Sequence, residues 1–81
     1  MKGFRILLVD DEPLMRLSMV DALEAIGHHV EAASSGTEGI EAIRQRPFDL
    51  VITDLRMPGA DGLTVLRATK EQSLPTEVFV I

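Results

Sequence analysis

Three short apolar runs, each continuous rather than alternating, constrain the fold of this chain more than any other feature. They occupy residues 6–9, 50–52 and 78–81. Strands that are covered on both faces of a parallel sheet have this pattern, because helices lie on either side of such a sheet. A weaker run at residues 29–33 alternates polar and apolar residues, which predicts a strand at the edge of the sheet.

The segment after the first run has the signals of a helix. Asp11 or Glu12 can cap its start, Pro13 suits its first turn, and Gly27 can end it. Apolar residues recur at helical spacing and form a broad surface. They are Leu14, Leu17, Met19, Val20, Ala22, Leu23 and Ile26.

Two further helices are predicted between the later runs. Ser35 and Glu38 have the spacing of a capping box that opens the second helix, and Pro47 follows its end. Residues 61–62, Asp-Gly, open the third helix, which closes near residues 73–75. The apolar residues assigned to these two helices are Ile40, Ile43, Leu63, Val65 and Leu66, of which Ile40 and Ile43 are expected to face the sheet.

Strand and helix therefore alternate three times before a fourth strand. This order predicts an α/β layered fold with a parallel sheet and right-handed crossovers. A length of 81 residues indicates one domain, residues 1–81. The chain has no cysteine, which fits a reducing compartment.

Charge and the N-terminus limit the classes of partner. The chain has thirteen acidic residues and eight basic ones. This balance disfavours direct nucleic-acid binding by this segment, since phosphate contacts need clustered Lys and Arg. The excess of acidic residues suits a cation ligand instead. The first apolar run is too short for a signal peptide or a membrane span. We therefore expect a cytoplasmic location and no membrane partner.

Three carboxylates follow the predicted strands. Asp10 and Asp11 come directly after the first run, and Asp54 follows Thr53 at the end of the run at residues 50–52. Parallel sheets place their ligand sites at the carboxyl ends of the strands, so neighbouring strands would bring these side chains together. Like charges at close range repel unless a cation or a proton lies among them. Mg²⁺ takes such oxygen ligands, and a carboxylate can act as a nucleophile toward a phosphoryl group.

Other interpretations compete with this one. In one alternative, Asp10 and Asp11 have no role beyond capping the first helix, and Asp54 has none beyond starting a turn at residues 57–59, Met-Pro-Gly. A phosphatase-like α/β enzyme with an Asp nucleophile is disfavoured, because that class typically separates its two Asp residues by one position and here they are adjacent. The glycine-rich loops of nucleotide-binding proteins are absent. The pair His28 and His29 suggests an exposed turn rather than a metal site.

Two segments of the chain resemble the receiver domains of response regulators in two-component signalling. Residues 6–13, ILLVDDEP, are similar to the family's first strand and acidic pair, and residues 48–62, FDLVITDLRMPGADG, to its phosphoacceptor strand and following loop. The resemblance implies a flavodoxin-like sheet with strand order 2-1-3-4 over the four strands, together with three helices.

The resemblance also implies roles for individual residues. Asp54 would accept a phosphoryl group from a sensor histidine kinase or a small phosphodonor, in a Mg²⁺-dependent reaction. Asp11 and Asp54 would bind Mg²⁺ directly, the backbone carbonyl of Arg56 would add a ligand, and Asp10 would act mainly through a metal-bound water. Such a protein is a signalling module rather than an enzyme, apart from phosphotransfer to its own Asp54.

In this family a Ser or Thr, a fourth helix, a fifth strand with a Lys, and a fifth helix follow the fourth strand. The sequence ends at Ile81, before any of them. We therefore expect an apolar edge at residues 78–81 and self-association through that edge or by segment exchange. An alternative function follows: a receiver fragment that forms a homo-oligomer and binds Mg²⁺ without effective phosphotransfer.

Overall fold

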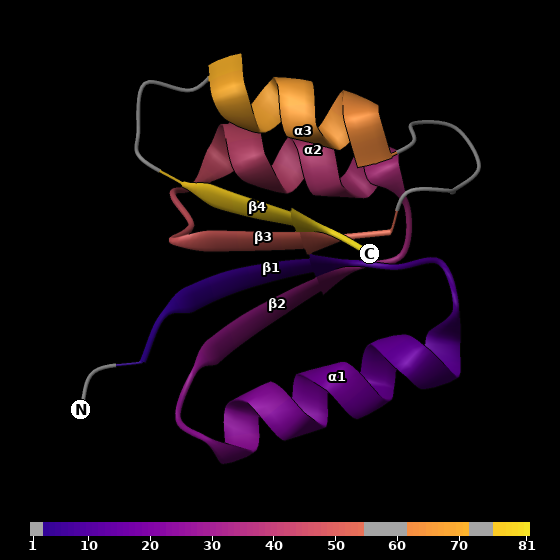
Figure 1. The fold of residues 1–81 in the computed structure, drawn as a ribbon, viewed down its shortest axis with the longest axis vertical. Coiled ribbons are helices and arrows are strands. Elements are labelled where there is room, and N and C mark those ends of the chain that lie inside the picture. Colours follow the sequence, from indigo (N-terminus) through magenta and orange to yellow (C-terminus); the bar gives the residue numbers. More distant parts are fainter. Residues whose placement is uncertain (1–2, 55–61, 72–75) are drawn as a thin grey trace.

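A four-stranded parallel sheet lies between two helical layers in the computed structural model (Figure 1). The structure describes residues 3–54, 62–71 and 76–81. Strands and helices alternate along the chain, as β1 Arg5–Val9, α1 Pro13–Ala25, β2 His29–Ala33, α2 Gly36–Gln45, β3 Leu50–Thr53, α3 Gly62–Glu71 and β4 Glu77–Val80.

The strand order is β2-β1-β3-β4, and each neighbouring pair is parallel. This confirms the predicted flavodoxin-like arrangement of four strands and three helices. Strand β2 lies at one edge of the sheet, which agrees with its alternating sequence. Strand β1 lies inside the sheet, and its residues 6–9 are all buried, which explains their continuous apolar run.

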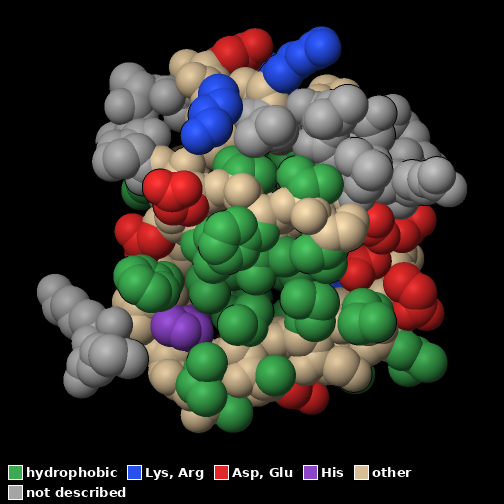
Figure 2. Space-filling model, viewed as in Figure 1, with side chains coloured by type: hydrophobic (Ala, Val, Ile, Leu, Met, Phe, Trp, Pro, Cys, Tyr) green, Lys and Arg blue, Asp and Glu red, His purple; other side chains and the backbone are tan. Residues whose placement is uncertain are grey.

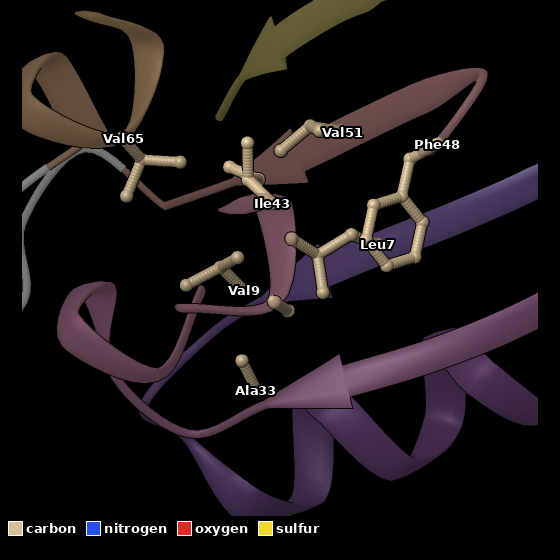
Figure 3. Packing of buried hydrophobic residues seen from close by; sticks show 8 residues of the cluster. Leu7, Val9, Ala33, Ile43, Phe48, Val51 and Val65 are labelled. Atoms are coloured by element: carbon tan, nitrogen blue, oxygen red, sulfur yellow. The ribbon is translucent and has the colours of Figure 1, made fainter. Parts of the chain in front are cut away.

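The larger core lies between the sheet and the layer formed by α2 and α3. Side chains from both central strands meet Ile43 of α2 and Val65 of α3 there (Figure 3). The cluster consists of Leu7, Val9, Ala33, Ala42, Ile43, Phe48, Val51 and Val65. Ile40 packs against it, so both helix residues expected to face the sheet do so. The side chains of Leu63 and Leu66 lie outside the described part of α3.

The opposite face of the sheet is covered by α1 alone among the described helices (Figure 1). Met19, Val20 and Leu23 pack there on a smaller cluster of Ile6, Leu8 and Ile52. No residue of α1 is fully buried. The rest of the apolar surface predicted for this helix is exposed to solvent, including Leu14, Leu17, Ala22 and Ile26.

Strand β4 departs from the expectation of a strand covered on both faces. Val78 packs on the larger core, but Phe79 is 58% exposed and Val80 is 39% exposed. These side chains are exposed because β4 forms one edge of the sheet, whereas α1 lies nearer the opposite edge, over β1 and β2. Hydrophobic side chains consequently gather on the surface over the strands, between α1 and the other two helices (Figure 2).

The predicted ends of α1 and α2 are observed, with one change of hydrogen-bond partner. Glu12 caps α1 by accepting from the backbone N–H groups of Leu14 and Met15, and Gly27 follows the helix with φ of 100°. Ser35 caps α2 by accepting from the N–H of Glu38, but the Glu38 carboxylate accepts from Ser34 instead of closing the box. The predicted ends of the third helix, Asp61 and residues 73–75, lie outside the described residues.

Candidate functional site

Three carboxylates converge where β1 and β3 end. One oxygen from each of Asp10, Asp11 and Asp54 lies within 4.8 Å of the others. Acidic side chains gather at the corresponding edge of the molecule in Figure 2. Asp10 is buried, Asp54 is half-buried and Asp11 is exposed, so the cluster opens from the sheet edge to solvent.

Backbone pairing places these residues. Val9 lies opposite Thr53 in the parallel register, so the next residue of each strand reaches the same edge. The N–H of Asp54 donates to the Val9 carbonyl over 3.0 Å, and the N–H of Asp10 donates to the Ala33 carbonyl over 3.1 Å. The prediction that neighbouring strands bring the three Asp residues together is therefore confirmed.

Asp10 is held by contacts at three of its polar groups. Besides its N–H bond, its Oδ1 accepts from the N–H of Glu12 over 2.9 Å, and its carbonyl accepts from the Arg16 guanidinium over 2.8 Å. With a side chain that is 3% exposed, Asp10 has little freedom to turn away from its neighbours. Its position is set by the backbone of the β1–α1 connection.

This arrangement suits a hard cation. One oxygen of each carboxylate lies within 4.8 Å of the others, and two unit charges at that separation repel by on the order of 3 kcal/mol at an effective dielectric constant of about 20. Mg²⁺ binds oxygen at about 2.1 Å in octahedral geometry, so its ligands lie about 3.0 to 4.2 Å apart, within the 4.8 Å limit found for these three oxygens. The donor set of carboxylate oxygens and the open side at Asp11 therefore fit Mg²⁺ with some of its waters retained.

Several predicted features are not tested by the geometry. Arg56, Met57, Pro58 and Gly59 lie outside the described residues. The His pair makes no metal site with other described residues. Instead, His28 Nδ1 accepts from the Phe4 N–H over 3.0 Å and its ring stacks on Phe4, which ties the turn before β2 to the start of β1.

Arg16 also contacts the site, and no sequence pattern indicated it. The one sequence signal for this contact is the position of Arg16 in the first turns of α1. From there a long side chain can reach back to the connection that follows β1.

Comparison with known proteins places this geometry in a family. The profile of the response regulator receiver domain matches residues 6–81, and the chain belongs to that family of two-component signalling modules. Receiver domains generally bind Mg²⁺ at an acidic pocket and are typically phosphorylated by sensor histidine kinases.

Individual relatives agree with this assignment. The chain is 40% identical over 67 residues to the response regulator receiver protein CpdR of Brucella abortus, covering 83% of this chain and 56% of that protein. It is 36% identical over 80 residues to a gliding motility regulatory protein of Myxococcus xanthus, covering 99% of this chain and 10% of that protein.

Solved structures agree as well. A receiver protein from Sinorhizobium medicae superposes with a TM-score of 0.89 at 32% identity, over 96% of this chain and 64% of that one. A receiver domain from Clostridium thermocellum gives 0.87 at 35% identity, over 94% and 62%. The chain thus spans less than two thirds of the length of these relatives. Within its described residues, no helix has the length and apolar character that a membrane crossing requires.

Proposed function

We propose that this chain is a Mg²⁺-dependent receiver that accepts a phosphoryl group on Asp54 from a sensor histidine kinase. The convergence of three carboxylate oxygens within 4.8 Å carries the proposal. Membership of the receiver family supports the reaction class.

In this proposal Asp54 is the nucleophile. Its half-buried carboxylate follows β3 at the open edge of the sheet. A carboxylate oxygen would form a bond to phosphorus as the phosphorus–nitrogen bond of a phosphohistidine breaks, and the histidine ring of the kinase would leave with the bonding electron pair and gain a proton from solvent to become neutral imidazole. The product is an aspartyl phosphate on this chain.

The other acidic residues would hold the metal. Asp11 and Asp54 would be direct ligands, the carbonyl of Arg56 a further one, and Asp10 would act mainly through a bound water. The burial of Asp10 and the bond from the Glu12 N–H to its Oδ1 support this indirect role, since one of its oxygens is already engaged. Bound Mg²⁺ would neutralise charge on the transferring group.

Phosphorylation can be tested with Mg²⁺ and acetyl phosphate, read by intact mass. We expect the wild-type chain to gain one phosphoryl group and Asp54→Asn to gain none. Asp21→Asn, which removes an exposed carboxylate from α1, is the matched control and should behave as wild type. Beryllofluoride, a phosphoryl mimic, should bind the wild-type protein and the control only. An adduct that persists in Asp54→Asn would disprove the assignment.

A second proposal concerns the exposed apolar surface over β4. Phe79, which is 58% exposed, pairs in register with Ile52 and so lies on the same face of the sheet as α1. It lines one pocket together with Phe4, which is 55% exposed. We propose that residues 1–81 fold as one unit that self-associates through this edge, because an exposed apolar strand edge is a template for another chain. In the alternative function, such an oligomer binds Mg²⁺ but is not phosphorylated effectively.

Light scattering after size-exclusion chromatography tests the association. We expect an oligomer for wild type and a shift toward monomer for Phe79→Lys, while Ser18→Lys on the exposed surface of α1 leaves the mass unchanged. A folded wild-type monomer at micromolar concentration would contradict it. Mg²⁺ binding that Asp11→Asn abolishes, without any phosphoryl adduct, would favour the alternative function. A cytoplasmic location and the absence of nucleic-acid binding remain predictions of the sequence.

A further inference from the structure

Arg16 makes a contact that neither family membership nor the acidic cluster explains. This residue is half-buried in α1, and its Nη1 donates to the backbone carbonyl of Asp10 over 2.8 Å. Its own N–H donates to the Glu12 carbonyl over 3.0 Å within the first turn of the helix. The side chain therefore reaches back from α1 to the connection that carries two of the three carboxylates.

The carbonyl that Arg16 binds belongs to the peptide group joining Asp10 to Asp11. A peptide group is planar, so fixing the direction of its oxygen also fixes the direction in which its nitrogen leads to the next Cα. Asp11 is exposed, and no hydrogen bond to its side chain is found among the described residues. The backbone therefore sets the point and direction from which its side chain extends.

We propose that Arg16 is a positioning residue for the metal site, holding the Asp10–Asp11 peptide so that both carboxylates face Asp54. This inference rests on the proposed Mg²⁺-binding function. Residues that orient metal ligands from outside the coordination sphere commonly change metal affinity when they are replaced.

The positive charge of Arg16 is expected to lower Mg²⁺ affinity, which is opposite to the effect of its hydrogen bond. A cation on the connection that carries Asp10 and Asp11 disfavours a metal ion nearby, so removal of this charge by itself would tighten metal binding. Among the described residues, the salt bridge joins Arg46 to Glu31. Arg16 contacts a backbone carbonyl and forms no ion pair there. We therefore expect the loss of the hydrogen bond to change Mg²⁺ affinity more than the loss of the charge. Weaker binding by a variant without Arg16 would indicate the hydrogen bond, and tighter binding would indicate the charge.

Isothermal titration of the 81-residue chain with MgCl₂ tests the proposal. We expect Arg16→Met to weaken Mg²⁺ binding about tenfold, the lower end of the range for ligand-orienting residues. Arg16→Lys keeps the charge and an N–H donor group but lacks the rigid guanidinium fork, and should weaken binding about threefold. Arg44→Met removes the same charge from the exposed last turn of α2 and should leave affinity unchanged.

Circular dichroism first establishes that each variant is folded. Unchanged or tighter binding by folded Arg16→Met would overturn the role of Arg16 and leave the proposed function intact. If Arg16→Met does not fold, Arg16→Lys decides, and wild-type affinity in that variant would overturn the proposal. Failure of the wild-type chain to bind Mg²⁺ would overturn the metal site itself, and with it the role of Arg16.

Discussion

The N–H of Asp54 donates to the carbonyl of Val9 over 3.0 Å, one residue beyond the last paired residues of β3 and β1. This hydrogen bond extends the strand pairing into the site. It holds the proposed phosphoacceptor beside the strand that leads to Asp10 and Asp11. The spacing of the carboxylates is thus a property of the sheet register.

Packing behind the site constrains Gly39 of α2. A Cβ atom at this position would lie 2.7 Å from Cγ2 of Val9. We expect Gly39→Ala to lower the free energy of unfolding by about 1–2 kcal/mol, because overpacking outweighs the better helix propensity of Ala. Urea unfolding measures this change. In a Val9→Ala background, which vacates the space, the same substitution should be neutral or stabilising, and an equal loss in both backgrounds would refute the steric explanation.

Charge repulsion in the acidic cluster predicts a stability change without metal. In EDTA, Asp11→Asn should raise the free energy of unfolding by about 0.5 kcal/mol, a modest value because Asp11 is exposed. In the wild type, Mg²⁺ at a hundred times its dissociation constant should add about 2.7 kcal/mol, and Asp11→Asn should lose that increment. Thermal melts with and without MgCl₂ measure both effects. An equal response to Mg²⁺ in the two proteins would argue against Asp11 as a ligand.

The turn after α1 predicts a backbone effect at Gly27. Its φ of 100° is unfavourable for residues with a Cβ atom, although nothing lies within 4 Å of the position that such an atom would occupy. Gly27→Ala should destabilise the protein by about 1–2 kcal/mol, and Gly27→Asn by less, since Asn tolerates positive φ better. Chemical denaturation of the two variants is the measurement. Equal losses would show that conformational strain is not the cause.

The Arg46–Glu31 ion pair should contribute little. Its shortest nitrogen–oxygen distance is 2.5 Å, but the two side chains are 36% and 38% exposed. We expect a coupling energy below about 1 kcal/mol that falls with added salt. A double-mutant cycle with Arg46→Met and Glu31→Gln in low and high NaCl measures it. A coupling that salt leaves unchanged would indicate a contribution from packing of the Arg46 stem.

Much of the site could be predicted because it follows from local sequence and one rule of sheet geometry. Asp10, Asp11 and Asp54 end apolar runs, and parallel strands end at one edge. Arg16 could not be predicted in the same way, because a long side chain has many possible targets until the helix is placed. The choice of Glu12 over Asp11 as the cap, and of Ser34 as the partner of Glu38, likewise depended on backbone directions.

The sequence by itself determined the element order, the parallel sheet and the three carboxylates, since apolar periodicity and helix caps act over a few residues. Only the tertiary structure decided how far each face is covered and how the site is held. Phe79 belongs to a continuous apolar run, yet it is exposed because its strand lies at the edge, away from α1. Asp10 is held by hydrogen bonds with Ala33, which is distant along the chain, and with Arg16, which lies in the following helix. Burial and ligand orientation depend on contacts between elements, and a local pattern does not specify those contacts.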